Sequence, residues 1–147
     1  MSGRRIALSR GIAAPVMSVW RCWTDPTVLP QWFGPDGFSC HTHDIDLRAG
    51  GHWLFDMIGP NGTTWPNRHR YTRIEMPYHF EFLMDSGSDD EAPVEVVMTL
   101  AADGNTTRIR YEMTFPSAAS RAMAVAHGAV DLGKQTLNKL AAMAQTL

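Results

Sequence analysis

The chain has 147 residues with a formal net charge of -2, and 44% of the residues are hydrophobic. This length and apolar fraction fit one globular domain over residues 1–147, and the near-neutral charge gives no electrostatic reason for nucleic acid or an anionic membrane as a partner. No apolar run approaches the roughly 20 residues of a membrane span or forms a signal peptide. We therefore expect a cytoplasmic protein in which Cys22 and Cys40 stay reduced.

The N-terminal part of the chain predicts one strand followed by two short helices. Apolar residues alternate with more polar ones from Ile6 to Ile12, as in a strand with one buried face. Pro15 stands where a helix can begin, and apolar residues then recur at helical spacing up to Trp23. A second short helix is expected from Leu29 to Phe33, before the turn signal Gly34-Pro35-Asp36-Gly37.

The middle of the chain predicts strands joined by turns. Most of these runs show alternating apolar residues, and Gly, Pro or Asp-Gly signals bound them. The expected strands are Phe38–Arg48, His52–Ile58, Arg68–Met76, His79–Asp85, Val94–Leu100 and Ile109–Phe115. Because short turns join neighbouring strands, the sheet should be antiparallel.

The C-terminal part predicts a long helix. Residues Ala118 to Leu147 include no proline, and their apolar side chains share one stripe. Ser117 is a natural N-cap, and a helix of about 28 residues would be roughly 42 Å long. The expected fold is α+β, with a curved antiparallel sheet of about seven strands around this helix.

A twisted sheet that closes on one helix can leave space between them. Large residues are expected to point into that space, and on the helix Ala126, Ala129 and Gly133 offer small side chains opposite them. Large residues opposite small ones can be good packing or can leave an apolar ligand cavity, and both readings stay open. The candidate apolar contacts are Trp53, Phe55, Met57, Phe82, Met84, Tyr111, Met113, Met123 and Val130.

Polar candidates lie on the long helix and on one strand. His127 and Asp131 are four residues apart on the helix and would share a face. If that face points inward, they could act as an acid–base pair; otherwise they are a surface ion pair. Asn67 and Tyr71, with Arg68, could orient the polar end of a ligand at the cavity mouth, or could belong to a turn.

A metal site is not expected. His41 and His43 should lie on one face of their strand, and Asp44 and Asp46 on the other. Two histidines leave the usual ligand set incomplete, and the chain has no phosphate-binding glycine loop or zinc spacing. We expect neither a metal nor a cofactor.

An ordered series of segments along nearly the whole chain carries a family resemblance. The segments are Ala14-Pro15, Val19-Trp20, Trp23-Thr24-Asp25-Pro26, Gln31-Trp32-Phe33-Gly34-Pro35, Asp46-Leu47-Arg48-Ala49-Gly50-Gly51, Phe55-Asp56-Met57, Gly59-Pro60-Asn61-Gly62, Pro66-Asn67-Arg68, Phe115-Pro116-Ser117-Ala118-Ala119, Gln135-Thr136-Leu137 and Lys139-Leu140-Ala141. Together they resemble the family named after the activator of the heat-shock protein 90 ATPase, in the START-like (polyketide cyclase/dehydrase and lipid transport) superfamily.

The resemblance implies the helix-grip (START/Bet v 1-like) fold, whose members bind lipids, hormones or polyketides between sheet and helix. One departure concerns the last helix, where many relatives carry a Gly-Trp pair and this chain has Leu132-Gly133. The missing indole should enlarge the cavity or let another side chain fill the space.

We therefore expect a binding protein for a small apolar or amphipathic molecule rather than an enzyme. The first alternative is a cyclase or hydrolase that uses His127 with Asp131. The second is a module that binds a heat-shock protein 90 chaperone through its surface. A homodimer stays open.

Overall fold

The computed structural model describes residues 2–147, and within them seven strands form one antiparallel sheet in the order β1-β7-β6-β5-β4-β3-β2. The strands are β1 (Arg5–Ile12), β2 (Ser39–Asp46), β3 (His52–Ile58), β4 (Thr64–Glu75), β5 (His79–Asp85), β6 (Val94–Asp103) and β7 (Thr106–Thr114). The helices are the 3-10 turn η1 (Ser2–Arg4) and the α-helices α1 (Val16–Thr24), α2 (Leu29–Trp32), α3 (Ala118–Ala126) and α4 (Ala129–Ala144). The predicted α+β fold is confirmed.

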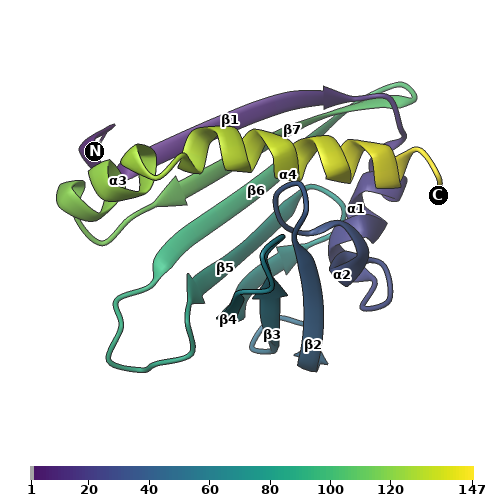
Figure 1. Cartoon of the computed structure of the whole chain (residues 1–147). Coiled ribbons are helices and arrows are strands. Elements are labelled where there is room, and N and C mark those ends of the chain that lie inside the picture. The colour runs from purple at the N-terminus through teal and green to yellow at the C-terminus, as the bar shows by residue number, and fades with distance from the viewer. Residues whose placement is uncertain (1) are drawn as a thin grey trace.

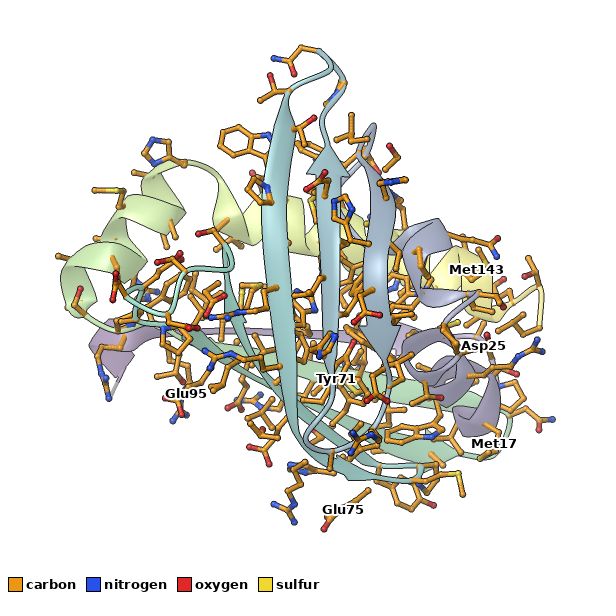
Figure 2. The ribbon with its side chains drawn as sticks, turned by 90° about the horizontal axis from the view of Figure 1, so that it is seen from below. Met17, Asp25, Tyr71, Glu75, Glu95 and Met143 are labelled. Carbon is orange, nitrogen blue, oxygen red and sulfur yellow. The ribbon has the colours of Figure 1, made fainter. Side chains whose placement is uncertain are left out.

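The helices cover one face of the curved sheet. In Figure 1, α3 and α4 run along this face, and the C-terminal end of α4 lies beside α1. Helices α1 and α2 link β1 to β2, which are the two edge strands, so this connection spans the whole sheet. Figure 2 shows the curvature, because β2, β3 and β4 run across the direction of β1 and β7.

The predicted continuous C-terminal helix is interrupted at His127 and Gly128. Gly128 has a φ of 88°, a left-handed conformation that glycine adopts without a Cβ penalty. The predicted N-cap is confirmed, since the Ser117 hydroxyl accepts a hydrogen bond from the backbone N–H of Ser120. Two helices of different direction thus replace the single cylinder expected from the sequence.

Strand β4 begins four residues before the position predicted for it. It starts at Thr64 and contains Pro66, which pairs with Asp56 of β3. Strand β5 pairs with β4 only from Arg68 onward, so the first residues of β4 have a partner on one side only. A proline is tolerated there, because the missing N–H can face the unpaired side.

The core between sheet and helices is rich in aromatic rings. Trp23 and Trp32 meet edge-to-face with centroids 4.8 Å apart, and Trp53 stacks on Phe55 at 3.6 Å. The largest fully buried side chains are Trp23, Trp32, Trp53, Phe55, Phe80, Phe82, Ile12, Leu29, Met98, Ile109, Leu140 and His69. His69 is the polar member of this set.

Candidate ligand site between helix and sheet

A small hollow lies between α4 and the sheet. Its volume is about 140 Å³, and it is lined by Phe33, Pro35, Tyr111, Met113, Ala129, Leu132, Gly133, Thr136 and Leu137. Tyr111 and Met113 come from β7, whereas the small residues Ala129 and Gly133 come from α4. Pockets for small molecules usually hold about 300–1,000 Å³, so this hollow accommodates only part of such a ligand.

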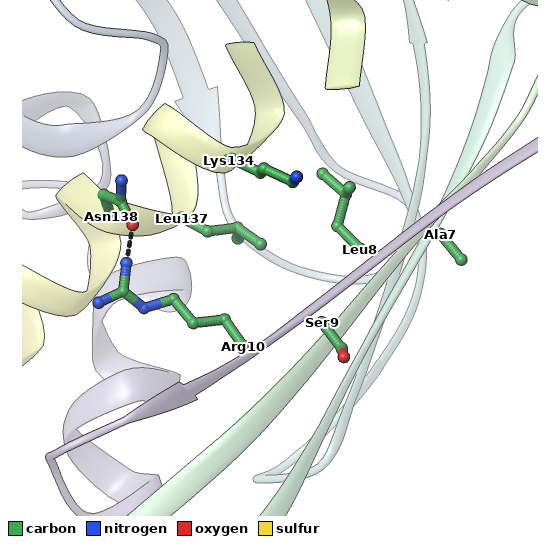
Figure 3. Close-up of a pocket in the computed structure, with 7 residues that line it drawn as sticks. All are labelled: Ala7, Leu8, Ser9, Arg10, Lys134, Leu137 and Asn138. Atoms are coloured by element: carbon green, nitrogen blue, oxygen red, sulfur yellow. Dashed lines mark hydrogen bonds between the residues drawn. The ribbon is translucent and has the colours of Figure 1, made fainter. Parts of the chain in front are cut away.

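A larger, open groove lies at the edge of the sheet, between β1 and α4 (Figure 3). Its volume is about 520 Å³, and its lining is Ala7, Leu8, Ser9, Arg10, Lys134, Leu137 and Asn138. Leu8 and Arg10 point toward the helix, whereas Ala7 and Ser9 point away from it. The Arg10 guanidinium donates a hydrogen bond to the side-chain oxygen of Asn138, which ties strand to helix across the groove.

Gly133 marks the boundary between these two hollows. A Cβ at this position would lie 2.6 Å from Cδ1 of Leu8, a separation that real structures do not tolerate. Leu8 is buried, so it already occupies the space next to Gly133. Leu8 therefore takes part of the space that the missing indole would occupy, and Gly133 still lines the hollow.

Only some of the predicted apolar contacts line the hollow between α4 and the sheet. Tyr111 and Met113 line the hollow, whereas Trp53, Phe55 and Phe82 are buried against other rings of the core. Met57 and Val130 are half-buried, and Met123 is 64% exposed on α3.

Two predicted contacts lie on a different surface. Met84 and Asn67 line a shallow groove with Trp65, near the start of β4. The Asn67 side-chain amide donates a hydrogen bond to the carbonyl oxygen of Trp65, at 3.0 Å. Asn67 therefore belongs to strand β4 and not to a turn, and it does not line the hollow between α4 and the sheet.

The condition for the His127–Asp131 acid–base pair is not met. Both side chains are exposed, and His127 Nδ1 lies 2.7 Å from the carbonyl oxygen of Met123. The reason is the helix break, because His127 caps the C-terminal end of α3 while Asp131 belongs to α4. Residues on either side of a left-handed glycine no longer share one helical face.

The histidines of β2 lie side by side as expected, with the rings of His41 and His43 5.1 Å apart, but the carboxylates do not lie on the opposite face. A β-bulge at His43 shifts the register between Thr42 and Asp44, so that Asp44 shares the face of His41. His43 Nε2 lies 2.9 Å from Asp56 Oδ2, and His52 Nε2 lies 2.6 Å from Asp44 Oδ2. Within residues 2–147, no group of three His, Cys, Asp or Glu side chains is arranged to hold a metal ion.

His69 was missed by the sequence interpretation. It is 2% exposed, and its ring stacks on Phe82 at 4.3 Å and meets Phe33 edge-to-face at 5.2 Å. Burial lowers the pKa of His69 to about 3, although the charge of Asp85 opposes the shift, so the ring is neutral at pH 7. Strand alternation could have identified it, because His69 and Tyr71 fall on one face and Arg68 and Arg70 on the other.

That opposite face of β4 carries a charged network. Arg68 donates to both carboxylate oxygens of Asp85, at 2.8 and 2.9 Å, and Arg70 donates to one of them at 3.0 Å. Arg68 also bonds Asp89 at 2.8 Å. These contacts account for Arg68, which ties β4 to the C-terminal end of β5.

The family model described as Activator of Hsp90 ATPase homolog 1-like protein matches residues 13–145. The chain belongs to this family. This match confirms the resemblance found in the sequence, and the chain shares its fold with solved structures. None of the curated proteins matches it. No helix of residues 2–147 is both long and apolar enough to cross a membrane.

Three solved structures illustrate the likeness. A Nitrosomonas europaea protein is 22% identical with a TM-score of 0.90, and the match covers 99% of this chain and 97% of that one. A Mycobacterium smegmatis protein is 26% identical with a TM-score of 0.86, over 99% and 93% of the two chains. The AHSA1 protein from Silicibacter pomeroyi is 22% identical with a TM-score of 0.76, over 94% and 95%.

Proposed function

We propose that the chain is a binding protein for a small apolar or amphipathic molecule, held between α4 and the concave face of the sheet. The observation that carries the proposal is the apolar hollow in which Tyr111 and Met113 face Ala129 and Gly133. Small residues on the helix and large ones on the sheet leave room for a guest that apolar walls would bind.

Binding without catalysis agrees with the chemistry of nearby side chains. Burial raises the pKa of the Cys22 and Cys40 thiols to about 12, so both stay protonated, and a thiol in that state is a poor nucleophile. The exposed positions of His127 and Asp131 remove the support for the cyclase or hydrolase alternative. The proposed role is therefore to hold or carry the molecule.

The test is a titration with a fluorescent fatty acid and with a polyaromatic probe. We expect micromolar affinity and, at about 100 times the dissociation constant, a stabilisation of about 2.7 kcal/mol. Ala129→Leu, which fills the hollow, should weaken binding at least tenfold. Ala142→Leu on the exposed side of α4 is the matched control and should bind like wild type. Equal binding by both variants, or no binding by wild type, refutes the proposal.

The family description supplies a second candidate function, which is stimulation of an Hsp90 ATPase. An exposed apolar groove formed by Met17, Trp20, Met76 and Leu147, among others, offers a protein-contact surface for it. Met17 and Met76 are 52% and 70% exposed. ATPase stimulation that Met17→Glu abolishes would support this function, and no stimulation by wild type would remove it.

A further inference from the structure

Strand β1 has an open edge. It stands first in the order of the sheet, so β7 pairs with it on one side and no strand of residues 2–147 pairs with it on the other. Figure 1 shows α4 running beside this strand, but a helix does not supply the main-chain ladder of a neighbouring strand. The open edge of a sheet presents N–H and C=O groups that another extended chain can bond.

Two hydrogen bonds at the start of β1 show which main-chain groups face the open edge. The Arg4 carbonyl accepts a hydrogen bond from the N–H of Phe115 at 2.7 Å, on the side of β7. The Arg5 carbonyl accepts one from the side chain of Arg121, on α3, at 2.7 Å. Main-chain groups of successive residues in a strand point to opposite sides. The odd-numbered residues of β1 therefore direct their N–H and C=O groups toward the open edge.

Ala7 and Ser9 are the odd-numbered residues that border the groove between β1 and α4. Both are exposed, and their side chains point away from the helix, so their main chain bounds the groove (Figure 3). Apart from the pairing with β7, no hydrogen bond to this main chain is found among residues 2–147. The groove of about 520 Å³ thus runs along a stretch of unpaired strand edge.

The side chains of this groove are basic and apolar. Arg10 and Lys134 are its two charged residues, and no acidic residue lines it. Neither cation has a carboxylate partner among residues 2–147, and the hydrogen bond from Arg10 to α4 goes to the neutral amide of Asn138. Leu8 and Leu137 add apolar surface. Electrostatic complementarity therefore favours an acidic partner with some apolar side chains.

A second copy of this chain fits the edge poorly. Strand β1 carries Arg5 and Arg10 and no acidic residue. Two copies paired along this strand would bring four guanidinium groups together, and like charges on paired strands are destabilising. Charged side chains on an edge strand are a common protection against such self-pairing. The occupant that the charges favour is thus a different, acidic chain.

We propose that the open edge of β1 binds an extended acidic segment of another protein, which adds to the sheet as an eighth strand antiparallel to β1. Alternate side chains of this segment face the groove, about 7 Å apart. An acidic side chain lies within reach of Arg10 and Lys134, and an apolar one lies against Leu8. The inference goes beyond the proposed small-molecule function and does not depend on it.

The probe is the peptide Thr-Val-Thr-Glu-Thr-Val-Thr, titrated into the whole chain in a calorimeter. Its valines and its glutamate alternate with threonines, so they share one face of an added strand. We expect saturable binding that weakens about tenfold when lysine replaces the glutamate. N-methylation of the two threonines beside the glutamate should also weaken it about tenfold, because these N–H groups would bond the edge of β1.

Charge reversal in the protein tests the same contacts from the other side. Lys134→Glu, at an exposed position, should make the chain prefer the lysine peptide. Arg10→Glu should do the same, and Lys134→Glu carries the test if loss of the bond to Asn138 lowers the melting temperature of Arg10→Glu. Arg48→Glu is the matched control, because Arg48 is 69% exposed beside β2, at the opposite edge of the sheet. It should bind like wild type.

Each remaining outcome decides against the proposal. It is overturned if wild type shows no saturable binding, or if the glutamate and lysine peptides bind equally. Equal binding of the N-methylated peptide would show that the main chain of β1 is not used. A dimer in sedimentation that the peptide does not dissociate would make a second copy the occupant, and displacement of the peptide by an equal concentration of single-stranded oligonucleotide would make nucleic acid the better partner.

Discussion

The Asp85 network offers a sharp test of the structure. Replacing Asp85 with Asn keeps the shape of the side chain but removes its charge. The side chain is fully buried and accepts hydrogen bonds from Arg68, Arg70 and, at 3.0 Å, the N–H of Gly87. Removing one partner of a buried pair costs about 3–5 kcal/mol, since it leaves an uncompensated charge.

The expected loss for Asp85→Asn lies at the low end of that range, about 3 kcal/mol. The side chain of Arg70 is 40% exposed, and Arg68 keeps its bond to Asp89. Urea unfolding should show a lower midpoint with an unchanged slope. Asp89→Asn is the control, because this partner is 89% exposed and should change stability by less than about 0.5 kcal/mol. A loss below about 1 kcal/mol for Asp85→Asn, or equal effects of both variants, refutes the reasoning.

The pH dependence gives a second readout for the same residue. Burial raises the pKa of Asp85, but hydrogen bonds from Arg68 and Gly87 and the charges of Arg68 and Arg70 outweigh it, so the pKa is lowered. A depressed carboxyl pKa contributes stability above its unfolded value of about 3.9 and loses it as the pH falls through the folded value. The stability gap between wild type and Asp85→Asn should therefore shrink below about pH 4.

Three further variants test other parts of the fold. Gly128→Ala should cost about 1–2 kcal/mol in thermal unfolding, because alanine would have to adopt the left-handed conformation; an unchanged melting temperature would contradict the helix break. Leu137→Ala, at a position 3% exposed that lines both hollows, should cost about 2–5 kcal/mol, and a loss under about 1 kcal/mol would argue against this packing. His69 has a folded pKa of about 3, so wild type should lose stability by up to about 1.4 kcal/mol per pH unit as the pH falls from about 6.5 toward 3. His69→Phe should flatten unfolding titrations over that range, and parallel curves would disprove the buried neutral ring.

Much of the sheet could be predicted because strand alternation is a local property. The alternating residues of β3, β5, β6 and β7 identified these strands, and their buried positions follow that pattern. The structure differs from the predicted strands where pairing with a neighbouring strand alters the alternation or the starting residue. The bulge at His43 and the early start of β4 at Thr64 depend on pairing partners that no local pattern contains.

The candidate site was only partly predictable for a related reason. Tyr111 and Met113 were expected to face the helix and do so. His127 and Asp131 were expected to share a face, but Gly128 can stand within a helix or in a left-handed turn, and its sequence neighbours do not decide which. Here α3 packs on η1 and the chain turns at Gly128 before α4 begins.

The sequence by itself determined the α+β class, the two short helices and the family. Periodicity, turn residues and an ordered series of segments can all be read from residues that are close together in the chain. Only the tertiary structure decided how the space between helix and sheet is used. Leu8 lies beside Gly133, Phe33 lines the hollow, and Nε2 of the buried His69 has no hydrogen-bond partner among residues 2–147. Such outcomes depend on close packing between side chains that are remote in the chain, and this packing is resolved only when the segments meet.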